Sequence, residues 1–224
     1  MAAAACVSTM LVAAPAVAES PRETLVSAAF QASDKDAAVA LINKAIQQAD
    51  AILAGQPGNR EALLQRAIAI GYRGKLTSNA ADAKMALKGF EALVASDPRD
   101  AEAQMAVAGW HLNAISQLGA MVARAALGAK RQAGDEALDK AVALGGNRAL
   151  FPGMAAIMRI RQDHRNIALA LKLAETAAAA PAPTSLDRYV KRAAQLMLPS
   201  LRAGDGKTAA ALAKRLAPFG RIKV

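Results

Sequence analysis

Few residues of this chain are of a type that could catalyse a reaction or bind a metal ion. The sequence holds two histidines, His111 and His164, and a single cysteine, Cys6. The histidines are 53 positions apart, and neither lies in an H-x-x-x-H or H-x-x-E pattern, which would place two ligands on one helix face. We therefore expect His111 to be a core or groove residue, and His164 to face solvent or cap a helix.

Motifs for phosphate binding and for nucleophilic catalysis are also missing from the sequence. There is no G-x-S-x-G, no G-x-x-x-x-G-K-[ST] and no G-x-G-x-x-G. The segment 204–208 (GDGKT) is superficially similar to a phosphate loop, but it lacks the upstream glycine and the preceding strand, so we interpret it as a turn. Asp97, Asp100 and Glu102 fit carboxylates in a first helical turn, which the helix dipole favours. The sequence predicts a protein that is not an enzyme and holds no metal or cofactor.

The first eighteen residues predict a signal peptide. No charge precedes Glu19, and the apolar stretch ends in Ala16-Val17-Ala18, the small-x-small pattern that signal peptidase reads. It is shorter than the roughly 20 residues of a membrane span. No Lys or Arg precedes it, and the alternatives are an uncleaved alanine-rich N-terminus or lipoprotein-type processing at Cys6. Cleavage after Ala18 would leave a cysteine-free chain, which suits the oxidising bacterial periplasm.

Residues 19–224 predict helices throughout. Hydrophobic residues make up 54% of the chain and aromatic residues only 3%, and no segment shows the alternation typical of strands. Ser20 to Glu23 (SPRE) fits a capping box with proline at the first helical position. A helix should run from Ser33 or Asp34 to about Ala54, and the next should begin at Asn59. Further helices are expected near 79–96, 100–118, 120–127, 130–144, 148–162, 164–179, 184–201 and 206–217.

The helix starts suggest a repeat. Pro57, Pro98, Gly146 and Pro183 each lie in a turn ahead of a helix rich in small residues, at spacings of 41, 48 and 37. A helix pair that cannot bury its own apolar face must stack on a neighbour, so such pairs occur in arrays. We therefore expect about five helix pairs.

Around Pro98 the sequence resembles the tetratricopeptide repeat family, whose unit is a pair of helices of 34 residues. Seven more positions match that pattern over residues 57–146: Ala86, Phe90, Val107, Ala108, Leu138, Ala141 and Val142. Four features depart from it: Leu93 replaces an alanine, His111 a tyrosine and Gly146 a proline, and the spacings exceed 34. The resemblance implies an α-solenoid of antiparallel helix pairs.

An insertion within residues 112–131 follows Trp110-His111. Gly119 and Gly128 bracket a short helical stretch in it, Ala120 to Leu127. This arrangement resembles a divergent tetratricopeptide-like subgroup of bacterial envelope proteins, which also includes the eukaryotic regulator-of-microtubule-dynamics family. The resemblance implies a concave groove that takes a peptide or a helix of a partner protein. The candidate groove residues are Tyr72, Gln104, Trp110 and His111.

Positive charge gathers toward the C-terminus. The chain has 28 Lys and Arg against 18 Asp and Glu, a net charge of +10, and residues 165–224 hold 11 basic and 3 acidic side chains. Such a face could attract an anionic polymer, lipid or protein surface, or simply be solvated. The export signal and the scarcity of aromatic residues argue against nucleic acid. The candidate basic surface comprises Arg188, Lys191, Arg192, Arg202, Lys214 and Arg215.

Together these features predict an exported, non-catalytic scaffold that binds a partner protein or peptide. One alternative is a helical component of an envelope solute-transport system, which an enclosed, polar-lined cavity would favour and an open, shallow groove would not. The other is a protein that binds an anionic envelope polymer or lipid surface through its basic helices, in which case moderate salt would abolish binding.

Overall fold

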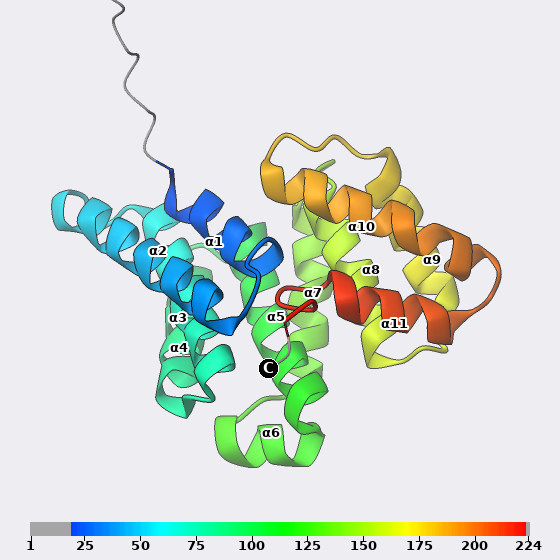
Figure 1. Cartoon of the computed structure of the whole chain (residues 1–224), viewed down its shortest axis with the longest axis horizontal. Coiled ribbons are helices and arrows are strands. Elements are labelled where there is room, and N and C mark those ends of the chain that lie inside the picture. The colour runs from blue at the N-terminus through cyan, green and yellow to red at the C-terminus, as the bar shows by residue number, and fades with distance from the viewer. Residues whose placement is uncertain (1–18, 223–224) are drawn as a thin grey trace, which may run out of the picture.

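The structure, a computed structural model, describes residues 19–222 and shows eleven helices and no strand over that range (Figure 1). The predicted all-α class is confirmed. The predicted signal peptide, 1–18, lies outside the described residues. The helices are α1 (Pro21–Phe30), α2 (Lys35–Gly55), α3 (Arg60–Thr77), α4 (Ala80–Ser96), α5 (Ala101–Leu118), α6 (Ala120–Leu127), α7 (Arg131–Leu144), α8 (Leu150–Gln162), α9 (Ile167–Ala179), α10 (Ser185–Arg202) and α11 (Gly206–Leu216).

Side-chain caps set most of the helix starts. Asp34 Oδ1 accepts a hydrogen bond of 2.8 Å from Ala37 N at the start of α2, and Asn59, Asn79, Asp100 and Asp205 cap α3, α4, α5 and α11 in the same way. These are the polar residues that satisfy the unpaired amides of a first helical turn. The turn predicted at 204–208 is therefore the α10–α11 connection, with Asp205 as its cap.

The capping box expected at α1 is only half formed. Ser20 Oγ accepts from Glu23 N at 3.3 Å, but the Glu23 carboxylate accepts a hydrogen bond of 2.7 Å from Ser185 Oγ on α10. The complete capping box occurs at α10, where Thr184 and Asp187 each accept from the other's backbone amide. Glu23 thus links the first helix to the tenth.

Helices that are neighbours along the chain make most of the contacts. α1 packs on α2, α2 on α3, α3 on α4 and α5 on α7, while α8, α9, α10 and α11 pack together in a second group. In Figure 1, α1–α4 lie on one side of the molecule and α8–α11 on the other, with α5 and α7 between them and α6 projecting away. Fully buried alanines, among them Ala38, Ala45 and Ala108, let the helices approach closely.

The C-terminal segment after α11 returns to the first helix. Phe219 N donates to Ala29 O at 2.8 Å, and the Phe219 ring packs edge-on against Tyr72 of α3, with centroids 4.9 Å apart. Nearby, the ring of Phe30 in α1 stacks on Tyr189 of α10 at 3.8 Å. The first helix is therefore in contact with α10 and with the tail, so the two outer groups of helices meet around the centre of the molecule.

Candidate ligand cavity

A cavity of about 430 Å³ lies at this centre. Its lining comes mainly from α1, α3 and α5, with smaller parts from α4, α6 and α8 and single residues from α10 (Leu186) and the tail (Pro218). α2, α7, α9 and α11 contribute no lining residue. The volume falls in the range of about 300–1,000 Å³ that is usual for small-molecule sites.

The lining is predominantly apolar. Its large apolar side chains include Leu25, Val26, Phe30, Leu64, Ile68, Phe90, Met105, Trp110, Leu150, Met154, Met158 and Leu186. Methionine is unbranched and polarisable, so Met105, Met154 and Met158 can adapt to ligands of different outline. A surface of this kind favours a hydrocarbon or aromatic group over water.

The charges at one end of the cavity neutralise one another. Arg22 lies 2.6 Å from both Glu61 and Glu102, and Arg148 lies 2.7 Å from Glu102 and 3.0 Å from Asp187. Burial lowers the pKa of Arg22, but hydrogen bonds to Glu61 and Glu102 outweigh it, and the net pKa is raised. This ion-pair chain runs from α1 through α5 to α10. Of its members, Arg22 and Glu102 line the cavity, and both are already paired, so they offer no free charge to a ligand.

Asp187 is the most buried member of the chain, with no exposed surface. It accepts hydrogen bonds from Leu150 N at 3.0 Å, from Thr184 Oγ1 at 2.7 Å and from Arg148 Nη2 at 3.0 Å. Burial alone would raise the pKa of this carboxyl, but the hydrogen bonds from Thr184 and Arg148 dominate and lower it. Asp187 is a structural carboxylate.

The other end of the cavity opens to solvent. The lining residues that are exposed there belong to the turn between α3 and α4 and to the α5–α6 corner: Ser78, Asn79, Ala80, Gln117, Leu118, Val122 and Ala126. Lys75, one turn before Ser78, lines this end, and Arg161 of α8 donates to Asn113 Oδ1 of the lining at 3.0 Å. Arg161 is not itself a lining residue. Burial lowers the pKa of Lys75, and the positive charge of Arg161 lowers it further.

One polar group in the wall has an unused donor. Gln65 lines the cavity and is 3% exposed, and its Nε2 has no hydrogen-bond acceptor within residues 19–222. A buried amide without a partner costs about 1–3 kcal/mol. A ligand oxygen in the cavity would offset that cost.

The structure separates the four candidate groove residues into two kinds. Tyr72 and Trp110 line the cavity. Trp110 Nε1 donates to Ala83 O at 2.7 Å, and burial raises the pKa of Tyr72 to about 12, so its hydroxyl stays protonated.

Gln104 and His111 do not line the cavity. Gln104 is buried and its Nε2 donates to Pro98 O at 3.0 Å, which fixes the turn before α5. His111 is buried and its Nδ1 accepts from Lys130 N at 3.3 Å, at the start of α7. Burial, with Lys130 as a smaller cause, lowers the pKa of His111, so the imidazole is neutral at pH 7.

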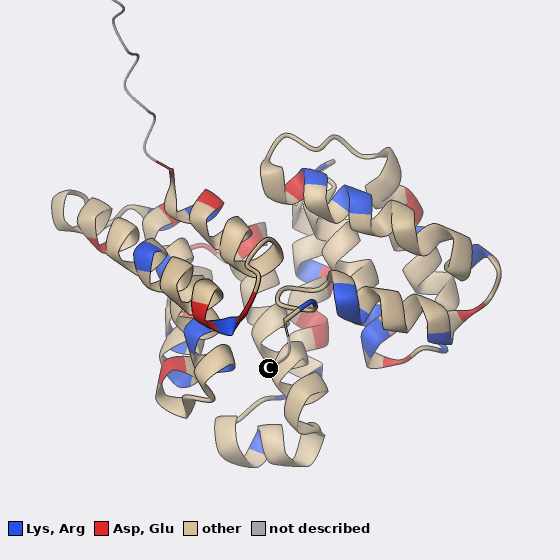
Figure 2. Ribbon diagram, viewed as in Figure 1, with Lys and Arg blue, Asp and Glu red and all other residues tan. Residues whose placement is uncertain are grey.

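The six candidate basic residues lie on α10 and α11 (Figure 2). Three are held by neighbours: Arg188 and Lys191 donate to the carbonyls of Pro183 and Ala180, and Arg202 lies 3.0 Å from Glu175. Arg192, Lys214 and Arg215 are exposed. The two helices remain candidates for binding an anionic surface, but none of the six basic side chains lines the cavity.

Sequence reasoning missed Lys75, Arg161 and Gln65. Each lies within a predicted helix, where a single Lys, Arg or Gln is ordinary. Only the packing of the helices brings Gln65 and Lys75 to the cavity lining and Arg161 into contact with Asn113 of that lining. No cluster of three or more metal-ligating side chains occurs in residues 19–222. Over the same residues, no helix combines the length and apolar character needed to cross a bilayer.

Comparison of the chain with protein-family models, with curated proteins and with solved structures gives no match.

Proposed function

We propose that this chain is an exported, non-catalytic, tetratricopeptide-like binding protein whose central cavity holds a small, largely apolar ligand. The observation that carries the proposal is the cavity itself, with its apolar wall and its one open end. The helices that supply most of this wall, α1, α3 and α5, correspond to the first members of the first three of the five helix pairs expected from the sequence. In a tetratricopeptide-like stack those helices form the concave side.

The contact between the tail and α1 favours a small ligand over a peptide laid along an open groove. Phe219 and Pro218 occupy the space between α1 and α3, where a continuous groove would otherwise run. The solute-transport alternative would be favoured by an enclosed, polar-lined cavity, whereas this cavity has an open end and an apolar wall. It suits an apolar or amphipathic molecule better than a strongly polar solute.

A fluorescent neutral probe, N-phenyl-1-naphthylamine, tests the proposal. We expect saturable binding by the wild type, with quenching or enhancement of the fluorescence of Trp110, which is the only tryptophan and lines the cavity. Ala106→Phe places a ring in the cavity and should weaken binding about tenfold or more, roughly 1.4 kcal/mol. Ala211→Phe on the exposed face of α11 is the matched control. Equal binding by both variants would show that the probe lies elsewhere.

A second candidate function, docking of a partner protein, is favoured by the α5–α6 corner. Leu118, Met121 and Val122 are 42%, 85% and 53% exposed, and Arg124 is the one charged residue of α6. An exposed apolar patch of this kind often marks an interaction site. A photo-reactive residue at position 121 should crosslink to one defined protein in intact cells, whereas the same residue at Met85, an exposed methionine of α4, should not. Identical adducts at both positions would argue against the docking function.

A further inference from the structure

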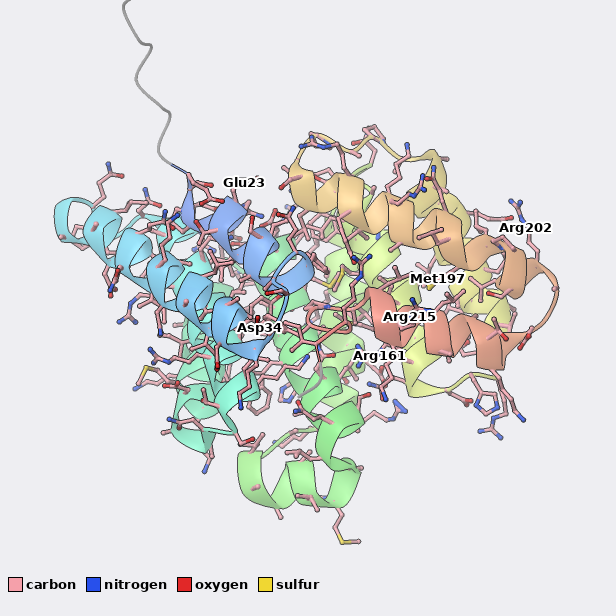
Figure 3. All side chains as sticks on the ribbon, viewed as in Figure 1. Glu23, Asp34, Arg161, Met197, Arg202 and Arg215 are labelled. Atoms are coloured by element: carbon pink, nitrogen blue, oxygen red, sulfur yellow. The ribbon has the colours of Figure 1, made fainter. Side chains whose placement is uncertain are left out.

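We infer that Lys75 and Arg161 bind the carboxylate of a single-chain amphipathic ligand, such as a fatty acid, whose hydrocarbon part lies in the cavity. The inference rests on the proposed function, because it assigns a ligand class to the same cavity. Figure 3 labels Arg161 near the middle of the molecule, between the two outer groups of helices.

The first argument is the contrast between the two ends of the cavity. At the end lined by Arg22 and Glu102, Arg22 and the neighbouring Arg148 each contact two carboxylates. At the open end, Lys75 donates to a backbone carbonyl, Pro218 O, at 3.2 Å, and Arg161 donates to Asn113 Oδ1 and, at 3.5 Å, to Ser116 Oγ. Within residues 19–222, no carboxylate acts on either cation, so Lys75, which lines the cavity, and Arg161, which reaches the lining through Asn113, both lack an acidic partner.

The second argument is the burial of these two cations. Burial lowers the pKa of Lys75 to about 8 and also lowers the pKa of Arg161. A charge taken out of water without a partner is unfavourable, and two like charges add to that cost. An anion between them would supply charge-assisted hydrogen bonds to both. The arrangement is therefore unfavourable when empty and suited to an anionic group.

The third argument is the order of the polar and apolar parts. Lys75 and Asn113 line the open end, next to the exposed residues of the α3–α4 turn, while Leu25, Val26, Leu64 and Leu150 line the cavity from buried positions. A molecule with one charged head and one apolar chain matches that order, with its head near water and its chain inside. A fully apolar ligand would leave the two cations unpartnered.

Binding of dodecanoate and of dodecan-1-ol, each below its aggregation concentration, tests the inference through Trp110 fluorescence. The two probes share the same alkyl chain and differ in the charge of the head. We expect the wild type to bind dodecanoate at least about tenfold more tightly, and Lys75→Met to remove most of that preference while leaving dodecan-1-ol affinity nearly unchanged. Arg161→Met should act in the same direction.

The controls separate loss of charge from loss of fold. Lys75→Arg keeps the charge and should keep the preference for dodecanoate, and Lys172→Met, at an exposed site on α9, should behave as the wild type. Equal affinity of the wild type for both probes would overturn the assignment of Lys75 and Arg161 but leave the cavity proposal standing. Failure of both probes and of N-phenyl-1-naphthylamine to bind would overturn the cavity proposal itself.

Discussion

The ammonium group of Lys75 lies 5.4 Å from the centre of the Phe219 ring, and these two residues connect α3 to the C-terminal tail. Lys75 also donates to Pro218 O across a sequence separation of 143 residues. The tail segment in turn packs on Ala29 of α1. The tail therefore joins the two outer groups of helices beside the cavity, and its anchoring can be tested.

Phe219→Ala should destabilise the protein by about 3–5 kcal/mol, because the ring is 3% exposed and a cavity would remain. Phe219 also has a φ of 62°, a left-handed conformation that non-glycine residues rarely adopt, so packing must hold it there. Urea unfolding followed by circular dichroism measures the change. Phe219→Leu keeps much of the volume and should recover more than half of the loss. A cost below about 1 kcal/mol for the alanine variant would mean that the tail does not join the two groups.

Lys75 should make stability depend on pH in the alkaline range. Its pKa is about 8 in the folded state, below the ordinary 10.5, so between these values the unfolded chain binds more protons than the folded one. Stability contributed through Lys75 must therefore rise as pH increases from 8 to 10.5. The free energy of unfolding of the wild type, measured relative to Lys75→Met, should increase over that interval. A constant difference between the two proteins would contradict the lowered pKa.

Arg148→Met should destabilise the fold by about 3 kcal/mol, because it leaves the buried Asp187 without its cationic partner. The remaining donors, Thr184 and Leu150 N, satisfy only part of the carboxylate. Adding Asp187→Asn to Arg148→Met should cost less than the sum of the single changes, since the unpaired charge is then removed. Strict additivity in urea unfolding would show that the pair is not coupled.

Gly134 allows α7 to approach α5 closely. A Cβ at this position would lie 2.9 Å from Leu112 side-chain atoms and 3.0 Å from His111 Cβ. Gly134→Ala should therefore cost about 1–3 kcal/mol through overpacking, measured by thermal or urea unfolding. Gly58→Ala is the matched control, because a Cβ there meets nothing within 4 Å. If both variants were equally stable, the α5–α7 contact would be looser than the structure shows.

The helices could be predicted from local signals, whereas the site could not. Several helices begin where a side-chain oxygen accepts a hydrogen bond from an amide three residues further on, as at Asp34, Asn59 and Asp100. The signal for a helix start therefore lies within one turn of sequence. Gly119 and Gly128 bracket α6 because each has a positive φ, 79° and 77°, which glycine adopts without strain. The surroundings of Lys75 depend instead on parts of the chain that are distant in sequence: Lys75 donates to Pro218 O, 143 residues further on, and Arg161 of α8 affects its pKa. No short sequence pattern encodes such contacts.

The candidate groove residues also show that a sequence pattern can place a residue on a helix without fixing the direction of its side chain. Tyr72 and Trp110 line the cavity, whereas Gln104 and His111 do not. Gln104 shares its helix with Trp110 but points to the Pro98 carbonyl, so helix membership alone did not fix its direction. His111 follows Trp110 directly, and consecutive residues of an α-helix point about 100° apart. Its side chain therefore faces the start of α7, where it accepts from Lys130 N, and not the cavity.

His111 should give the protein an acid-sensitive stability. Burial lowers its pKa below the ordinary 6.5, so as pH falls through that value the unfolded chain takes up a proton that the folded one resists. Stability should therefore decrease from pH 7 to pH 5, and His111→Leu should show a smaller decrease because it removes the titrating group. Urea unfolding at the two pH values measures the difference. His164→Asn changes the exposed histidine and should keep the wild-type dependence of stability on pH. If that variant lost as much of the pH dependence as His111→Leu, the dependence could not be assigned to His111.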